Sequence, residues 1–154
     1  MSLRTRVLEP SCGKGDIIEA IRRAHPDVDL TAIEQNLTLQ GVLTAKGFGD
    51  IVSYGDFLAH GGEYDRVVLN PPFEHGQDID HVRHAYALLD GGGRAVSVVC
   101  EGPFFRSDAK SVAFRKWLDE IGAEVEQLPD DAFQGIDAFR QTGVKTRLVT
   151  IDNP

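Results

Sequence analysis

Short apolar runs alternate along this chain with segments in which apolar residues recur at helical spacing. The run Val67-Val68-Leu69 is unbroken, as in strands that are covered on both faces. In contrast, Ile17, Ile18 and Ile21 recur at the period of a helix. Strands that alternate with helices build a parallel sheet with helices on both of its faces. The alternation therefore predicts an α/β fold, a three-layer sandwich around a mostly parallel sheet.

The pattern predicts about seven strands and four helices. The strands are expected at 6–9, 29–34, 50–54, 64–70, 95–100, 124–128 and 145–151. The helices are expected at 15–24, between Asn36 and Gly47, between a cap at Asp78 and the stop Gly91-Gly92-Gly93, and at 111–121. No crossover helix is predicted between the last two strands, so we expect the last strand to pair antiparallel.

Length and composition suit one domain that spans residues 1–154. We expect a soluble, cytoplasmic protein, because the apolar runs are too short for a membrane span and no secretory signal is evident. Cys12 and Cys100 form neither a disulfide framework nor a metal-ligand spacing. Lys and Arg total 16 against 24 acidic residues, a net charge of −8. A protein that binds nucleic acid unaided usually carries a basic face, so such a substrate would need a further source of affinity.

A glycine-rich turn, Ser11-Cys12-Gly13-Lys14-Gly15, follows the first predicted strand. In an open parallel sheet, ligands bind beyond the carboxyl ends of the strands. A dinucleotide site would want a third glycine where Ile18 stands. Glu9 precedes the turn, and its carboxylate favours a cofactor with an ammonium and a sulfonium over a pyrophosphate. A tight strand-to-helix turn without a ligand is the simpler alternative.

Two further carboxylates follow neighbouring strands. Glu34 closes the second predicted strand, where a carboxylate can accept hydrogen bonds from ribose hydroxyls. NAD enzymes do the same, so Glu34 favours a nucleoside cofactor without choosing which. After the third strand, Gly55-Asp56-Phe57 could place a carboxylate on an adenine amine and a ring beside it, although, taken alone, these residues fit an ordinary turn better.

The most specific motif is Asn70-Pro71-Pro72-Phe73, directly after the buried fourth strand. The Asn70 side chain offers an uncharged acceptor, and proline rings leave backbone carbonyls free to face a ligand. Two oxygens that accept the hydrogens of a conjugated amine favour its pyramidal, nucleophilic geometry. Phe73 can stack on a flat acceptor, as flipped bases are held. Asn-Pro also marks simple turns, but this one falls at the same sheet edge as the other motifs.

Together these motifs resemble those of class I S-adenosylmethionine-dependent amino-methyltransferases, particularly the phage and plasmid type of DNA adenine methyltransferase. The segments Leu128-Pro129 to Ala132-Phe133 and Thr142-Gly143-Val144-Lys145-Thr146 are similar to the closing hairpin of that group. The resemblance implies a Rossmann-like methyltransferase sandwich with S-adenosyl-L-methionine as cofactor. Adenine in DNA is the acceptor it implies first, and no metal is implied.

The resemblance also implies residue roles. The residues expected to bind the cofactor are Glu9, Ser11, Gly13 and Gly15 at its methionine end, Glu34 and Gln35 at its ribose, Asp56 and Phe57 at its adenine, and Asn70. The residues expected to act on the acceptor are Asn70 and Pro71 at its amine, Pro72, and Phe73 stacked on the base. Direct attack of the acceptor nitrogen on the sulfonium methyl is the implied mechanism, with much of the effect arising from positioning.

Two departures from the family pattern bear on partners. The family usually carries an upstream helix that closes the cofactor pocket and a target-recognition domain, and this sequence provides neither. We therefore expect help from a further segment or from a partner protein. The alternatives are an RNA base or a protein glutamine as acceptor, a non-catalytic cofactor-binding subunit and, more remotely, a dehydrogenase.

Several other residues are not expected to carry chemistry. His81 and His84 lie three apart on one predicted helix, and solvent exposure is expected for both rather than a metal. Glu74 and His75 follow the Asn70 motif and could contact substrate. The aromatics of the segment 101–105 could line an acceptor pocket or pack in the core, and Trp117 is expected in the core.

Overall fold

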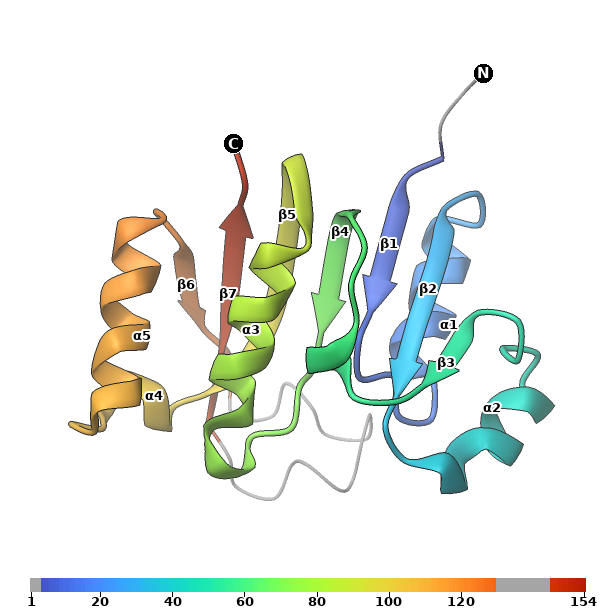
Figure 1. Ribbon diagram of the computed structural model, residues 1–154, viewed down its shortest axis with the longest axis horizontal. Helices are drawn as coiled ribbons and strands as arrows, with labels where there is room; N and C mark the ends of the chain where they lie inside the picture. Colours follow the sequence, from blue (N-terminus) through green and yellow to red (C-terminus); the bar gives the residue numbers. More distant parts are fainter. Residues whose placement is uncertain (1–3, 130–144) are drawn as a thin grey trace.

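The computed structural model describes residues 4–129 and 145–154 (Figure 1). Within these residues, seven strands form one sheet, and five α-helices pack against it. The strands are β1 (Arg6–Glu9), β2 (Asp29–Glu34), β3 (Val52–Tyr54), β4 (Tyr64–Leu69), β5 (Leu89–Cys100), β6 (Glu124–Gln127) and β7 (Thr146–Asp152). Their order across the sheet is β3-β2-β1-β4-β5-β7-β6. The sheet is parallel except at β7, which pairs antiparallel with both β5 and β6. The predicted fold class is confirmed, including the antiparallel last strand.

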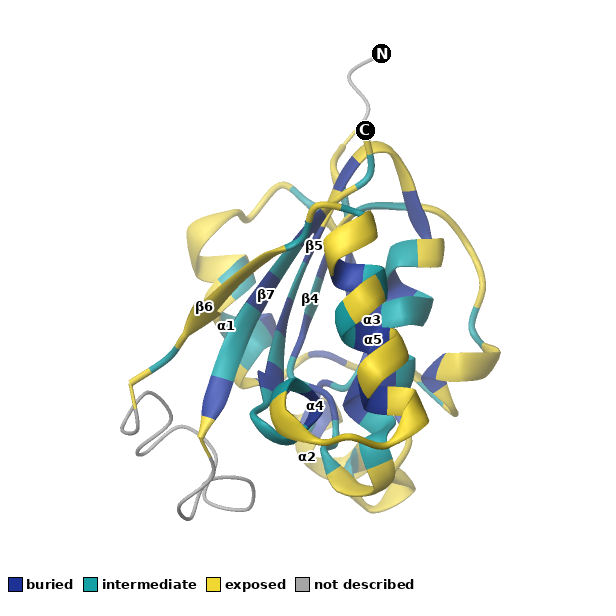
Figure 2. Ribbon diagram, turned by 90° about the vertical axis from the view of Figure 1, so that its left-hand side faces the viewer, coloured by how far each residue is buried: buried dark blue, intermediate teal, exposed yellow. Residues whose placement is uncertain are grey.

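Helices cover both faces of the sheet, as Figure 2 shows in a view along its edge. The helices are α1 (Asp16–Ala24), α2 (Gln40–Ala45), α3 (Gln77–Ala87), α4 (Gly102–Phe105) and α5 (Ala109–Glu120), with short 3-10 turns η1 (Leu37–Leu39), η2 (Phe57–Ala59) and η3 (Glu74–Gly76). On one face, Ile18 of α1 and Leu43 of α2 pack with apolar residues of β1 to β3. On the other face, helices α3 and α5 pack against β5 and β7 around the fully buried Phe114. None of the described helices has the length and apolar character needed to cross a membrane.

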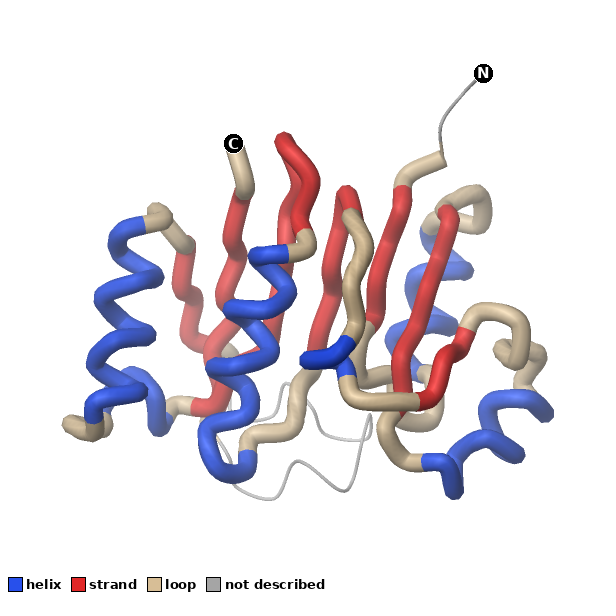
Figure 3. The backbone as a smooth tube through the Cα atoms, viewed as in Figure 1, coloured by secondary structure: helices blue, strands red, loops and turns tan. Residues whose placement is uncertain are grey.

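The chain reverses its direction of travel across the sheet between β1 and β4. The first three strands run outward from β1, and β4 then returns to the other side of β1. Ligands of open α/β sheets bind at the carboxyl ends of the strands beside such a reversal. The loops after β1, β2, β3 and β4 therefore meet at one edge, which is the lower edge in Figure 3.

Two boundary predictions around α3 were wrong. Asp78 lies inside the helix, fully buried, and its carboxylate accepts hydrogen bonds from the backbone N–H and Sγ of Cys100, both at 3.1 Å. Gly76, in the left-handed conformation, is the N-cap instead. At the other end, the helix stops at Ala87, and Gly91-Gly92-Gly93 belongs to the start of β5. The buried carboxylate links α3 to the end of β5, a tertiary role that local sequence rules cannot anticipate.

Arg6 and Asp65 connect β1 to β4 at the amino-terminal side of the sheet. The Arg6 backbone N–H donates to Asp65 at 2.8 Å, and its guanidinium lies 3.2 Å from the same carboxylate. The side-chain bond from Arg6, followed by this backbone bond, holds the pKa of Asp65 below its usual value.

A carboxyl group whose pKa is lowered by folding stabilises the protein above its unfolded-state pKa and loses that contribution as the pH falls. We expect Asp65→Asn to lower the free energy of unfolding at pH 7. We also expect the difference from wild type to shrink below about pH 4, near the unfolded-state pKa of aspartate. Urea unfolding across this pH range measures the effect, with the exposed Asp119→Asn as control. A difference that stayed constant with pH would contradict it.

Candidate functional site

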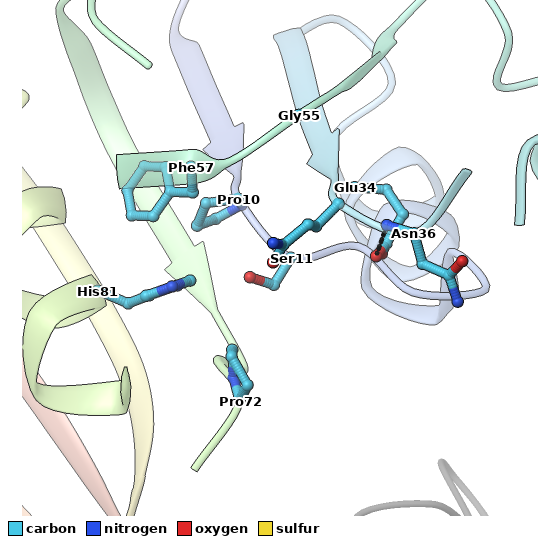
Figure 4. A pocket seen from close by; sticks show the side chains of 9 residues that line it. Pro10, Ser11, Glu34, Asn36, Gly55, Phe57, Pro72 and His81 are labelled. Carbon is cyan, nitrogen blue, oxygen red and sulfur yellow. Dashed lines mark hydrogen bonds between the residues drawn. The ribbon is translucent and has the colours of Figure 1, made fainter. Parts of the chain in front are cut away.

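A cleft opens at the carboxyl edge of the sheet, at the reversal between β1 and β4. Its volume is ≈ 230 Å³, smaller than the roughly 300–1,000 Å³ of most small-molecule sites. Loops after four strands, together with helix α3, supply its lining residues (Figure 4): Pro10, Ser11, Glu34, Gln35, Asn36, Gly55, Phe57, Pro72 and His81. The cleft therefore gathers segments from all of the sequence motifs that were predicted to carry function.

The glycine turn after β1 needs its glycines for conformation and for space. Gly13 and Gly15 have φ values of 53° and 94°, which side chains rarely adopt. A Cβ on Gly15 would also lie 2.9 Å from the ring of Phe48. The turn closes through a 2.8 Å hydrogen bond from the Gly15 N–H to the Cys12 carbonyl. These features bring the backbone of the turn to the rim of the cleft with no side chain at Gly13.

Glu34 is the last residue of β2. Its side chain contacts the glycine turn and also lines the cleft. Its Oε2 accepts a 2.8 Å hydrogen bond from the Gly13 N–H, and its Oε1 accepts a 3.2 Å bond from the Asn36 N–H. The residue is only 8% exposed, yet it lines the cleft. A carboxylate has about four acceptor positions, so each oxygen keeps capacity for a ligand donor.

Glu9 and Cys12 lie beneath this rim. Glu9 is fully buried, and its Oε1 accepts a 3.2 Å hydrogen bond from the Ser11 N–H, which orients the residue that lines the cleft. Burial, followed by the charges of Glu9 and Glu34, raises the pKa of the Cys12 thiol to about 12. Cys12 therefore stays protonated at neutral pH and packs in the core.

The two side chains that follow β3, Asp56 and Phe57, have different structural roles. Asp56 is exposed, and its Oδ1 caps η2 by accepting a 2.9 Å bond from the Leu58 N–H. Phe57 is buried at 2% exposure, and one side of its ring reaches the cleft. Asp56 is therefore adjacent to the lining residues rather than among them.

The Asn70 loop follows β4 directly and borders the cleft through Pro72. Asn70 is half-buried, Pro71 is buried, and Pro72 lines the cleft. Phe73 is half-buried at the start of η3, whose His75 has the left-handed φ of 56°. The loop thus turns sharply away from the sheet after Phe73, with the two prolines fixing its path.

The structure brings most of the predicted residues to one place, although not all to the cleft surface. Those that line it are Ser11, Glu34, Gln35, Phe57 and Pro72. Those that support or flank the lining residues are Glu9, Gly13, Gly15, Asp56, Asn70, Pro71 and Phe73. In the hairpin segments, Ala132, Phe133 and the stretch 142–144 lie outside the described residues. Within the described chain, no three His, Cys, Asp or Glu side chains are grouped so that they could hold a metal ion.

Four lining residues, Pro10, Asn36, Gly55 and His81, were not among the predicted site residues, and His81 departs most from its expectation. It was expected to be exposed, but it is 6% exposed and its ring packs against Phe57 with 5.3 Å between centroids. His84 lies on the other part of the same ring at 4.8 Å, and its Nε2 lies 2.7 Å from the carbonyl oxygen of His60. Its spacing of four residues from the apolar Ala85 was a signal for burial. That spacing could not reveal that η2 packs onto α3.

We expect His81→Ala to destabilise the fold by roughly 1–3 kcal/mol, because a cavity opens beside Phe57 in the floor of the cleft. Chemical denaturation measures this change, and the exposed His25→Ala serves as the control. An unfolding free energy equal to that of the control variant would show that the His81 ring does not support the cleft.

No protein-family model matches the chain, but individual proteins do. It is 34% identical to the ribosomal RNA small subunit methyltransferase C of Shewanella loihica over 103 residues, which cover 60% of this chain and 30% of that protein. It is 29% identical to the methyltransferase of the same name from Chromohalobacter salexigens over 140 residues, covering 82% of this chain and 38% of the relative. The chain thus spans about a third of the length of these curated relatives.

Solved structures match almost the entire chain. TrmN from Thermus thermophilus has a TM-score of 0.66 at 23% identity, covering 97% of this chain and 44% of that one. The 16S rRNA methyltransferase KamB has a TM-score of 0.65 at 13% identity, with 97% and 88% covered. The geranyl diphosphate C-methyltransferase of Streptomyces coelicolor, solved with S-adenosyl-L-homocysteine, has a TM-score of 0.65 at 12% identity, with 97% and 70% covered. The sheet order and these matches together establish that the chain has the fold of the class I S-adenosylmethionine-dependent methyltransferases.

Proposed function

We propose that this protein is an S-adenosylmethionine-dependent methyltransferase that modifies an exocyclic amino nitrogen of a base in RNA. The observation that carries the proposal is the meeting of the Glu34 carboxylate, the glycine turn and the Asn70 loop around one cleft. The DNA preference that the sequence motifs suggested finds no support among the relatives, which are named for ribosomal RNA. RNA therefore replaces DNA as the proposed polymer, while the amine chemistry stays the same.

The cofactor's adenosyl group suits the chemistry of the cleft. Both oxygens of Glu34 keep acceptor capacity and can take hydrogen bonds from ribose hydroxyls. Phe57 offers an apolar ring beside Gly55, where a flat adenine can lie. Because the cleft holds only ≈ 230 Å³, part of the bound nucleoside would extend past its rim towards the exposed Asp56.

The cofactor's methionine end would lie at the glycine turn. The buried Glu9 carboxyl lies below Ser11, and in its ionised form it would favour a ligand that carries an ammonium and a sulfonium. When bound, S-adenosylmethionine supplies a methyl group on a positively charged sulfur. The glycine turn then holds this end close to the reversal between β1 and β4, within reach of the Asn70 loop.

The Asn70 loop would bind the acceptor amine. The Asn70 side-chain oxygen and the Pro71 carbonyl would accept its two hydrogens and direct the nitrogen lone pair at the methyl carbon. Transfer would form a nitrogen–carbon bond as the carbon–sulfur bond breaks, so that the sulfur would leave as a neutral thioether, and the nitrogen would then lose one proton to water. Fixed orientation of the two reactants supplies much of the rate enhancement in such a direct transfer.

The negative net charge of the chain affects how strongly it can bind RNA. With a net charge of −8, the chain offers little general attraction for phosphates. We propose that a partner protein or a further segment contributes part of the RNA affinity, as the sequence motifs already suggested.

Two measurements test the proposal. Calorimetry should detect binding of S-adenosylmethionine and S-adenosylhomocysteine but not of NAD, which also separates the dehydrogenase alternative. Incubation with radiolabelled cofactor and separate pools of RNA, DNA and protein should label the RNA. Binding without label in any pool would favour a non-catalytic cofactor-binding subunit, and label confined to DNA or protein would contradict the RNA assignment.

A further inference from the structure

An exposed aromatic ring lies on helix α4 (Gly102–Phe105), which follows β5 at the same edge of the sheet as the loop after β4. The ring of Phe105 is 68% exposed, the highest value among the described large hydrophobic side chains. Its neighbour Phe104 faces the other way, into the cluster around Phe114 and Trp117. The Phe104 ring therefore belongs to the core, whereas the Phe105 ring is exposed to solvent.

Two guanidinium groups lie at helix α4, and that of Arg147 contacts this ring. The Cζ of Arg147 lies 4.5 Å from the Phe104 centroid and 5.3 Å from the Phe105 centroid. Arg147 also donates a 3.0 Å bond to Glu101, so its charge is already compensated. Arg106 is exposed, and its guanidinium folds over the backbone of Gly102, 2.7 Å from where a Cβ would stand.

Helix α4 is fixed in place by the helix that follows it. The Nη1 of Arg115 donates 2.8 Å hydrogen bonds to the carbonyl oxygens of Pro103 and Arg106. These bonds hold both ends of α4 against α5, so Phe105 and Arg106 are presented on a rigid support. A rigid aromatic side chain loses little conformational entropy when a ligand stacks on it.

Helix α4 lies at the same edge of the sheet as the loop that is proposed to bind the acceptor amine. The helix follows the carboxyl end of β5, and the Asn70 loop follows the carboxyl end of the neighbouring β4, with Leu69 in register with Ser97. Both segments thus emerge at the same edge of the sheet (Figure 1). A polymer whose target base is held by the Asn70 loop would pass α4 with an adjacent nucleotide.

We propose that Phe105 and Arg106 bind a nucleotide adjacent to the target base in single-stranded RNA. The base stacks on Phe105 and the phosphate lies on Arg106, while Arg147 supports the ring from behind. Exposed aromatic rings with nearby cations are the usual platform for unpaired nucleotides, because every base has a face that can stack. The inference rests on the proposed function, since it assumes that the acceptor at Asn70 belongs to RNA.

The test compares variants of the 154-residue chain for binding to a fluorescent single-stranded RNA and to DNA of the same sequence. We expect Phe105→Ala to weaken RNA binding by about 5- to 150-fold, the range for loss of one stacked base, and Phe105→Trp to retain it. We expect Arg106→Ala to reduce the slope of log affinity against log salt by roughly 0.7, the value for one phosphate contact on a single strand. Val125→Ala and Lys116→Ala, at exposed sites on β6 and α5, are the matched apolar and charge controls.

Calorimetry with S-adenosylhomocysteine separates this inference from the proposed function. Unchanged cofactor binding in Phe105→Ala, together with weaker RNA binding, would support the inference. RNA affinity equal to that of the Val125→Ala control, or a loss seen with DNA alone, would overturn it and leave the proposed function intact. Failure of the wild-type protein to label any RNA would instead count against the proposed function.

Discussion

Asn70→Ala should lower kcat by at least about 100-fold, the typical cost of misplacing a reacting group, while cofactor affinity stays near the wild-type value. The Asn70 side chain is proposed to accept a hydrogen from the acceptor amine, and alanine has no acceptor. The nitrogen would then keep its lone pair delocalised in the base and lose its alignment with the methyl group. Single-turnover transfer of a labelled methyl group measures the effect, with cofactor binding followed separately by calorimetry.

The conservative variant Asn70→Asp sharpens this prediction, because it keeps an acceptor oxygen at the same position. We expect it to retain more activity than the alanine variant. A fully active Asn70→Ala protein would exclude a catalytic role for Asn70 and would favour a cofactor-binding subunit whose chemistry takes place on another chain.

Glu34→Ala should weaken S-adenosylhomocysteine binding by roughly 100-fold or more. Hydrogen bonds to charged groups contribute about 1.5–3 kcal/mol each, and Glu34 is proposed to accept two from the ribose. The substitution also removes the acceptor of the 2.8 Å bond from the Gly13 N–H, so the glycine turn loses a support. Titration calorimetry measures the affinity.

Glu34→Gln separates these two contributions, because it keeps the volume of the side chain while removing its charge. The exposed Glu63→Ala is the control for removal of a carboxylate far from the cleft. If Glu34→Ala bound the cofactor product as tightly as Glu63→Ala, the ribose assignment would have to be abandoned.

The sheet was predictable because its signals are local. The second half of β4, in which Val67 and Leu69 are buried, reads as an unbroken apolar run. The turns after β1, β2 and β4 carry glycine, a carboxylate and Asn-Pro directly at the strand ends. The parallel topology then brings those ends together, so the meeting of Ser11, Glu34 and Pro72 in one cleft followed from strand order alone. The antiparallel β7 was predicted because no crossover helix was expected before it.

The missed features depend on contacts between segments that are distant in sequence. Asp78 has the composition of an N-cap, but Cys100 provides hydrogen-bond donors that hold it inside the fold. His81 is a polar residue that becomes buried because η2 packs Phe57 onto α3. Helix α4 was not predicted as a helix at all, since four residues give no periodicity and Arg115 supplies the stabilising bonds from another helix.

The sequence motifs did not distinguish DNA from RNA as the substrate. The Asn70-Pro71-Pro72-Phe73 motif is proposed to hold an amine on a flat group, and amines on DNA and RNA bases are alike in this respect. The motif therefore favoured amino-nitrogen chemistry without distinguishing the two polymers. The names of the relatives shifted the proposal to RNA. Contacts to the ribose 2′-hydroxyl, the group that distinguishes RNA from DNA, would have to provide the discrimination.

Mass spectrometry of nucleosides from RNA incubated with the protein and methyl-labelled S-adenosylmethionine tests the central claim most directly. The account predicts label on a base that carries a methylated exocyclic nitrogen, formed by the wild-type protein and lost in Asn70→Ala. Label on a ribose hydroxyl or a ring carbon would contradict it, and so would equal labelling by the two proteins.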